Sequence, residues 1–320
     1  MTKSSMICAG IDTGKHKLDA AIDGRRGSVM VDNAESGHAK LSAWLRRHHV
    51  ERVGIEATGG YEGTVVARLR RDGFVVVVFQ PAQVRAYAKF ELQRAKNDKI
   101  DAALIAACTA ATKTIHAPPD PRLSPLAAHL TLIEQITDDI VRFKTRRESC
   151  HGDMDLRRFW TAEIARLKAL LREKLDRLEA AIRMHPDLAE RLDLIASIDG
   201  VGSRTAIAIL LRMPEIGRVS REQAAALAGL APYDDDSGTR VRVRHIAGGR
   251  ARLRSALYAA ALPAAFRWNK QIIRIYRRLI ANGKPHKQAL VACARKLIIY
   301  VNAVVARGTP WLSRTSDQPA

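Results

Sequence analysis

Residues 6–12, MICAGID, hold the pattern that decides the fold, because an apolar stretch ends there on an acidic residue, Asp12. A second apolar stretch, residues 52–55, ends in the same way on Glu56. Short apolar runs of this kind are typical of buried strands. We therefore predict two strands that each carry a carboxylate at their end.

A further acidic pair follows along the chain. Asp98 and Asp101 lie three residues apart within residues 96–106, which have a helical pattern, and residues three apart share one face of a helix. Carboxylates from two strand ends and one helix can converge on a pair of Mg²⁺ ions about 3.5–4 Å apart, which stabilise the attacking and leaving oxygens of phosphoryl transfer. The four acids therefore predict a nucleic-acid phosphotransferase.

The predicted elements around these acids follow the order three strands, helix, strand, helix, strand. This is the order of an RNase H-like fold, whereas a flavodoxin-like doubly wound sheet would alternate strand and helix from the start. We expect the last strand to be central and buried, because it is a continuous apolar run. The elements are two strands within residues 5–23 around a turn at 13–16, a strand at 28–31, a helix at 36–48, the strand ending at Glu56, a helix at 61–71 and a strand at 74–79.

Positive charge is concentrated in the last third of the chain. The 320 residues have a formal net charge of +20, and the segment from Ser237 onward contributes +16 of it, with 17 Lys or Arg and a single acid, Asp317. Such a one-sided field attracts polyanions such as nucleic acids. A positively charged surface without a special partner is the alternative, but these arginines cluster with glycines and aromatic residues.

The cysteines indicate a reducing, cytosolic setting. Cys8, Cys108, Cys150 and Cys293 have neither CxxC nor Cys/His metal-ligand spacing, and three of them lie in apolar surroundings typical of buried thiols. The N-terminus runs straight into a strand without a signal peptide, and the valine run at 75–79 is too short to span a bilayer. We expect no membrane partner.

A proline-rich break at residues 118–121 predicts a domain boundary. Two helices are expected after it, at 122–149 and 155–184, and they form either a helical hairpin or coiled coil for spacing or dimerisation, or plain amphipathic core helices. The apolar face of the second helix contains Trp160, Ile164, Leu167, Leu171, Leu175, Leu178 and Ile182. The predicted domains are 1–117, 118–190 and 191–320.

Two glycines, Gly200 and Gly202, mark a turn in the third region, within the sequence IDGVGSRTA at 198–206. The pattern resembles a helix-hairpin-helix, in which glycines let backbone N–H groups approach a phosphate at a helix N-terminus. Any tight corner between two helices is the alternative. We favour contact with a nucleic-acid backbone, because the small Ala206 follows at the spacing that close packing needs.

Ser237 is a candidate nucleophile because arginines follow it at regular spacing. Three of them would share one face of a strand, and three more open a long helix. Guanidinium groups are favoured bidentate phosphate ligands, so a hydroxyl beside them could attack a phosphate. Taken alone, Ser237-Gly238 is a turn dipeptide, no His/Asp triad surrounds it, and the acids at 234–236 put the local geometry in doubt. The predicted nucleic-acid ligands are Gly200, Gly202, Arg240, Arg242, Arg244, Arg250, Arg252 and Arg254.

Together these motifs resemble the DEDD insertion-sequence transposases of the IS110 family, which are related to pilin-gene invertases. The resemblance extends over nearly the whole chain, and the common order of the pieces is more specific than any one of them. The matching pieces are GID at 10–12, GIEATG at 54–59, KNDKID at 96–101, IDGVG at 198–202, LAGLAP at 227–232, SG at 237–238 and GRARLR at 249–254.

The resemblance implies a RuvC-like N-terminal domain, a coiled coil and a C-terminal transposase domain. It implies that Asp12, Glu56, Asp98 and Asp101 hold Mg²⁺, and that Ser237 attacks the scissile phosphate to form a covalent phosphoserine link to DNA. It also implies a non-coding bridge RNA that pairs with donor and target DNA. A composite site between the protomers of a dimer, or of a tetramer on DNA, would act in the bacterial cytoplasm at the nucleoid.

Two other functions remain possible from the residues. A metal-dependent endonuclease of the Holliday-junction type would use the same four acids to hydrolyse DNA with water, but it would need only the first domain. A non-catalytic nucleic-acid-binding protein would have these acids as solvated or capping residues, and their ordered occurrence argues against it.

Overall fold

The computed structural model describes residues 6–93, 98–113, 120–233 and 245–312. Contacts within the chain divide it into two compact units, Met1–Pro118 and Pro119–Ala320. The predicted domains 1–117, 118–190 and 191–320 stay a prediction.

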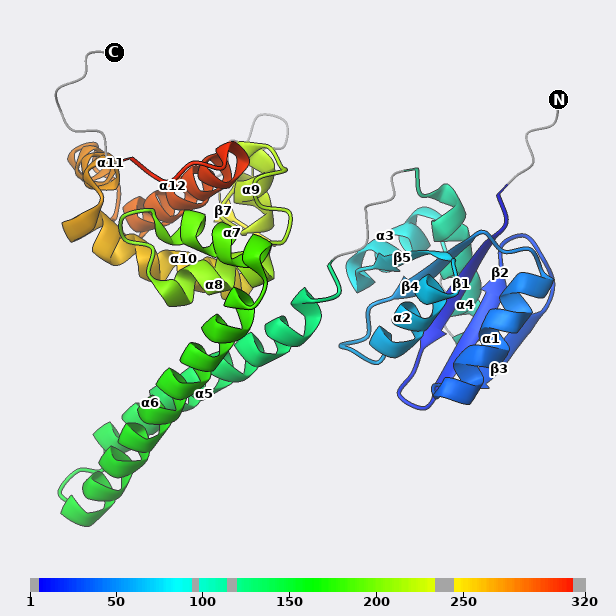
Figure 1. The fold of residues 1–320 in the computed structure, drawn as a ribbon, viewed down its shortest axis with the longest axis horizontal. Helices are drawn as coiled ribbons and strands as arrows, with labels where there is room; N and C mark the ends of the chain where they lie inside the picture. Colours follow the sequence, from blue (N-terminus) through cyan, green and yellow to red (C-terminus); the bar gives the residue numbers. More distant parts are fainter. Residues whose placement is uncertain (1–5, 94–97, 114–119, 234–244, 313–320) are drawn as a thin grey trace. The chain divides into compact units, whose positions relative to one another are not determined.

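The first unit is built on a five-stranded sheet of order β3-β2-β1-β4-β5 (Figure 1). Its first three strands form an antiparallel meander, and β4 and β5 run parallel to β1. This is the RNase H-like topology that the order of elements predicts. The strands are β1 (Cys8–Thr13), β2 (Lys17–Ile22), β3 (Ser28–Asp32), β4 (Arg52–Glu56) and β5 (Val75–Phe79).

Alternation of side chains along β1 and β4 gives the sheet two different faces. Ile11 and Ile55 point to a core that also contains side chains of α1 (Glu35–Arg47) and α2 (Gly63–Arg71). The opposite face of the same strands is covered by α4 (Asp98–Ala111). The sheet is therefore buried on both sides at its centre, and the acids that end β1 and β4 belong to the face of α4.

The prediction that the valine-rich strand is central is wrong. Among the described residues β5 pairs with β4 alone and forms an edge of the sheet, and Val75 and Val78 are 45% and 36% exposed. Val76 and Phe79 point inward. A run of identical apolar residues has no periodicity, so it cannot distinguish a central strand from an edge strand.

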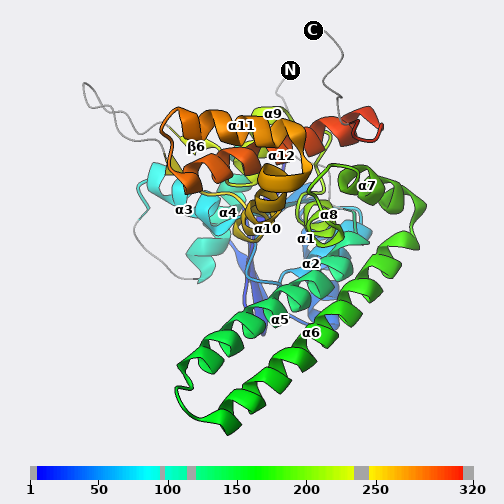
Figure 2. The ribbon, with the colours of Figure 1, turned by 90° about the vertical axis from the view of Figure 1, so that its left-hand side faces the viewer.

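The second unit begins with a long helical hairpin, α5 (Leu123–Ser149) and α6 (Met154–Arg183), which lie side by side in both views (Figures 1 and 2). The ranges match the two predicted helices. The distal half of the hairpin has a small core of its own, whereas its base shares the main core of the unit. The other elements are α7 (Pro186–Ala196), α8 (Ser203–Arg212), α9 (Arg221–Leu227), β6 (Pro232–Tyr233), β7 (His245–Ile246), α10 (Ala251–Pro263), the π-helix η1 (Ala264–Trp268), α11 (Lys270–Ala281) and α12 (His286–Arg307).

α12 is the one described helix that is long and apolar enough to cross a membrane. Half of that apolar window is buried inside the protein. Cys293, Leu297 and Val301 are fully buried in the main core of the second unit. The apolar character of α12 is therefore that of a core helix.

Candidate active site

Asp12 and Glu56 end neighbouring parallel strands, so they lie at the same edge of the sheet. The register pairs Ile11 with Ile55, and each acid is the next residue of its strand. Because successive side chains alternate between faces, both acids lie on the face opposite the isoleucines. Both are partly exposed, which leaves them accessible to a ligand.

α4 packs directly against β1 and β4 because each strand has a glycine at the crossing. A Cβ atom at Gly10 would lie 2.2 Å from the backbone nitrogen of Ala106, and one at Gly54 would lie 1.8 Å from the Thr109 hydroxyl. A larger residue at either position would push the helix away from the sheet. The glycine of the GID motif is therefore explained by the close approach of α4.

The direction of α4 brings its acidic first turn to the edge where the two strands end. The Arg52 guanidinium, at the start of β4, donates to the carbonyl of Thr112, just past the last residue of α4, at 2.9 Å. Ala102, near the helix start, meets Gly10 farther along the sheet. α4 thus runs antiparallel to β1 and β4, and its first turn, with Asp98 and Asp101, lies toward the same edge as the two strand-end acids.

The described side chains form only part of the predicted ligand set. Asp101 is partly exposed, whereas the side chain of Asp98 lies outside the described residues. Among the side chains that the structure describes, no three acidic, histidine or cysteine groups are placed so that they could hold a metal ion. A site made of all four acids, and metal binding by them, stay predictions. Their oxygen atoms are the donors that Mg²⁺ prefers.

A fifth acid, Asp19 of β2, lies beside Asp12 and is missing from the sequence prediction. The two residues are directly opposed in the antiparallel pair of β1 and β2, so their side chains share a face. Asp19 is 5% exposed, and the ammonium group of Lys17 lies 3.4 Å from its Oδ2. The signal that could have found it is the polar pair Lys17 and Asp19, spaced two apart on a strand that is otherwise apolar.

One side chain, Asn33, joins the two loops beside the acids. Its amide donates to the carbonyl of Gly14, after β1, at 2.9 Å and to the carbonyl of Tyr61, after β4, at 3.1 Å. Its Oδ1 lies 2.8 Å from Nε2 of His38. An amide oxygen only accepts, so His38 donates from Nε2. Asn33 therefore holds the loop that follows Asp12 against the loop that follows Glu56.

His38 makes this network sensitive to pH. The ring is 2% exposed, burial lowers its pKa below the ordinary value of 6.5, and Nδ1 has no hydrogen-bond partner among the described residues. Protonation at Nδ1 would place an unpaired donor and a charge in the core. Because the folded pKa lies below the unfolded one, the stability that the neutral ring contributes is complete above pH 6.5 and is lost as the pH falls below it.

We therefore expect the free energy of unfolding of the first unit to decrease as the pH falls below about 6.5. Hydrogen exchange resolved by peptide, which reports the opening free energy of the first unit separately, would measure it at each pH. His38→Gln should have a smaller pH slope than the wild type, whereas His16→Gln, at an exposed position, should keep the wild-type slope. Equal slopes in all three proteins would contradict the role given to His38.

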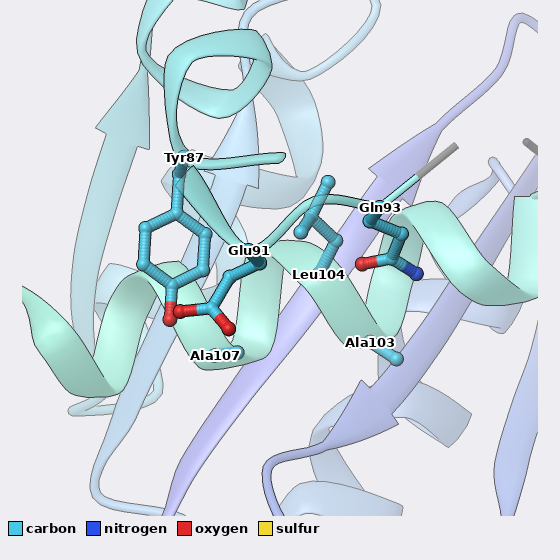
Figure 3. Close-up of a pocket in the computed structure, with 6 residues that line it drawn as sticks. All are labelled: Tyr87, Glu91, Gln93, Ala103, Leu104 and Ala107. Carbon is cyan, nitrogen blue, oxygen red and sulfur yellow. The ribbon is translucent and has the colours of Figure 1, made fainter. Parts of the chain in front are cut away.

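A separate cavity of about 330 Å³ lies between α3 (Pro81–Phe90) and the outer face of α4 (Figure 3). The hydroxyl of Tyr87 and the carboxylate of Glu91 lie next to each other there, and burial, together with Glu91, raises the pKa of Tyr87. Among the described residues, neither a basic side chain nor any of the predicted acids lines the cavity.

Ser237, Arg240, Arg242 and Arg244 lie outside the described residues. The strands on either side of their segment are described: β6 and β7 pair antiparallel, with Tyr233 opposite His245. The chain thus enters and leaves the serine segment at adjacent positions. The nucleophilic role of Ser237 stays a prediction.

Two glycines contact each other at the two ends of the region that contains Ser237. One precedes β6 and the other follows β7. Gly229 and Gly249 both have positive φ, +68° and +64°, and a Cβ atom at Gly249 would lie 2.2 Å from the nitrogen of Gly229. The Arg254 guanidinium donates to the carbonyl of Gly248 at 2.7 Å. The LAGLAP and GRARLR motifs are therefore packed against each other, which explains their glycines structurally.

Two more predicted DNA ligands also have partners within the chain. The Arg252 guanidinium forms an ion pair with Asp138 of α5 at 2.7 Å, and that of Arg250 pairs with Glu215. These contacts attach the start of α10 to neighbouring elements. Contact of Arg250, Arg252 and Arg254 with DNA stays a prediction, and their described role is to hold α10 in place.

The two glycines of the turn between α7 and α8 differ in how closely other residues surround them. Gly200 has a φ of +93°, and a Cβ atom there would lie 2.5 Å from that of Ala264 in η1. Gly202 precedes α8 with open space around it. Gly200 is thus needed for packing, and Gly202 alone has room for a ligand.

Two family models match successive parts of the chain. A family model for DEDD transposases of the IS110 type, described as "Transposase", matches residues 9–150, and one described as "Transposase IS116/IS110/IS902 family" matches residues 192–277. The pilin gene-inverting protein of Moraxella bovis is 27% identical over 324 residues, which cover 96% of this chain and 98% of that protein.

Two further matches cover less than half of the chain. The insertion element IS110 uncharacterized 43.6 kDa protein of Streptomyces coelicolor is 32% identical over 139 residues, which cover 43% of this chain and 34% of that protein. A structure of T. thermophilus RuvC in complex with a Holliday junction substrate is 22% identical and covers 32% of this chain and 91% of that chain, with a TM-score of 0.27. The two family models and the full-length relative, taken together, show that the chain belongs to the IS110 family and is a DNA transposase/recombinase.

Proposed function

We propose that this transposase cuts and rejoins DNA through a covalent link to Ser237, with the four acids Asp12, Glu56, Asp98 and Asp101 holding Mg²⁺. The observation that supports the proposal is that Asp12 and Glu56 end neighbouring parallel strands, on the sheet face against which α4, the helix with Asp98 and Asp101, packs. Bound there, Mg²⁺ would stabilise negative charge on the phosphate oxygens. Gly10 and Gly54 let α4 lie directly against β1 and β4.

The serine step balances without any further reactant. The Ser237 oxygen forms a bond to phosphorus, the bond from phosphorus to one deoxyribose oxygen breaks, and the serine proton leaves while that sugar gains a hydroxyl. A hydroxyl of the recipient strand then attacks the phosphoserine and releases the serine. The phosphate linkage is conserved, so strands are rejoined without an external source of energy.

The choice of DNA sequence is proposed to lie in an RNA. The net charge of +16 from Ser237 onward suits a nucleic-acid backbone, which carries no sequence information by itself. A bridge RNA paired with donor and target DNA would supply that information, as in other RNA-guided systems. Because acids and serine lie in different units, we propose a composite site in a dimer, or in a tetramer on DNA, in which the acids of one protomer face the serine of another.

A denaturing gel tests the proposal with labelled donor and target DNA, the RNA encoded beside the gene, and Mg²⁺. We expect a protein–DNA adduct with the wild type and none with Ser237→Ala. Ser255→Ala is the matched control, because Ser255 is an exposed serine of α10 whose hydroxyl donates to the carbonyl of Ala251 (3.1 Å). Cleavage without an adduct, unchanged in Ser237→Ala, would instead support the hydrolytic endonuclease.

A further inference from the structure

Three aromatic rings from three different elements form an exposed cluster on the second unit. Phe266 of η1 lies 4.9 Å from Tyr276 of α11 and 6.1 Å from His286 at the start of α12, centroid to centroid. The Tyr276 hydroxyl and His286 Nδ1 are 2.7 Å apart, which fixes these two rings relative to each other. Phe266 is 55% exposed, so the outer ring of the cluster faces solvent.

A second exposed ring lies two residues farther along η1. Trp268 is 56% exposed, and the Arg267 guanidinium lies 4.8 Å from its ring centroid. Exposed aromatic side chains bury their area when a partner binds, and the exposed areas of Phe266 and Trp268 are not part of the core of the unit. Both residues belong to the π-helix η1, and short π segments are frequent at functional sites.

Exposed cations are numerous in the same elements as the rings and just beyond them in the sequence. The sequence contains no acid between residues 237 and 316. In the part of the second unit that the structure describes, none of the exposed cations on and near α11 forms an ion pair. They are Arg267, Lys270, Arg274, Arg277, Arg278, Lys284 and Lys287. Arg274, Arg277 and Arg278 share one helix face by spacing, and α11 lies beside α12 in both views (Figures 1 and 2).

The end of η1 is fixed in position by a buried asparagine that bonds to two other elements. Asn269, 1% exposed, accepts from the backbone of Ile272 at 3.1 Å and donates to the carbonyl of Asp199 at 3.2 Å, in the turn between α7 and α8. Gly200 of that turn packs against Ala264 of η1. A buried polar group with both partners satisfied gives one defined position to the end of η1. The rings are therefore presented without the need to order a loop.

Exposed aromatic rings together with many cations suit the binding of unpaired nucleotides better than the binding of a duplex or a protein. Unpaired bases stack on exposed aromatic rings whatever their sequence, and the phosphates between them are neutralised by cations. A duplex buries the faces of its bases, so it could use the cations but not the rings. A protein partner would have to supply many carboxylates to match so many unneutralised cations.

We propose that Phe266 and Trp268, with the cations of α11, form a platform for unpaired nucleotides, on which bases stack while the backbone follows the basic face. The ligand is single-stranded nucleic acid, either an unpaired stretch of RNA or a DNA strand opened during recombination. The platform does not depend on the chemistry of Ser237. A failure of the covalent mechanism would therefore leave it untouched.

Fluorescence anisotropy with the full-length protein tests the platform. The probes are labelled 12-nucleotide single strands of DNA and of RNA, and a DNA duplex of the same length. Phe266→Leu and Trp268→Leu should each weaken single-strand binding by about tenfold and duplex binding by less than about twofold. Phe266→Tyr, which keeps the ring, should bind as the wild type does. A preference for RNA or for DNA identifies which source of unpaired bases the platform takes.

Phe159→Leu is the matched control, because Phe159 of α6 is also 55% exposed but lies on the hairpin. It should bind all three probes normally. Single-strand binding that is unchanged in Phe266→Leu and Trp268→Leu would overturn the proposal. So would an equal loss for the single strands and the duplex, which would indicate a purely electrostatic surface. Ser237→Ala should bind the single strands as the wild type does.

Discussion

Asp12→Asn is expected to reduce DNA cleavage by about a thousandfold or more, while the protein stays folded. Asp12 lies next to Glu56 at the strand ends and opposite Asp19, so it is the central carboxylate of the group. An amide keeps the size of the side chain but removes the charge that a divalent cation needs. Cleavage of labelled donor DNA, measured as a single-turnover rate with Mg²⁺ and the RNA, gives the effect.

The control for Asp12→Asn is the same substitution at Asp23, which lies at the other end of the pair formed by β1 and β2. Asp23 is exposed and lies just past β2, where its backbone bonds to Cys8 at the start of β1. Asp23→Asn should cleave at the wild-type rate. A thermal melt should show Asp12→Asn to be folded. If the two variants cleave equally well, the acids at the strand ends have no part in the reaction.

Gly10→Ala is expected to destabilise the first unit by about 3 kcal/mol or more, at the upper end of the cost of overpacking. The added methyl group would lie 2.2 Å from the backbone nitrogen of Ala106 and 2.3 Å from the carbonyl oxygen of Ala102. Backbone atoms of a helix cannot move aside as a flexible side chain can, so α4 as a whole must shift. Because α4 also carries Asp98 and Asp101, activity should fall together with stability.

Hydrogen exchange resolved by peptide measures this effect, because it reports the opening free energy of β1 and α4 separately from the second unit. Gly63→Ala is the matched control: Gly63 begins α2, and a Cβ atom there meets nothing within 4 Å. It should leave exchange in β1 and α4 unchanged. If Gly10→Ala also leaves it unchanged, the helix is not held as closely to the sheet as described.

The fold of the first unit can be predicted from the sequence because two patterns agree: the apolar stretches that end on acids, and the order of strands and helices. Apolar stretches that each end on an acid fix the strands and the position of Asp12 and Glu56 within them, and the order of elements fixes the topology. The helical spacing of Asp98 and Asp101 then places them on one face of α4. Each of these patterns depends on neighbours in the sequence, so it can be recognised without the fold.

Features that depend on distant contacts could not be predicted in this way. The edge position of β5 is set by which strands pair in the sheet, and its run of valines does not indicate this position. Asn33 joins two loops that come together only in the folded sheet. Arg252 has the spacing of a DNA ligand, yet its described partner is Asp138, more than a hundred residues away along the chain. A single sequence cannot distinguish a cation that holds a helix from one that binds phosphate.

Mass spectrometry of the trapped adduct tests the central claim, that a serine and four acids act in one reaction, most directly. The wild type would be reacted with donor DNA, RNA and Mg²⁺, denatured, and digested with a nuclease and trypsin. We predict a nucleotide attached through phosphate to the Ser237 hydroxyl, and no attachment in Asp12→Asn. A nucleotide on another residue, or efficient cleavage with no attached nucleotide, would contradict the account.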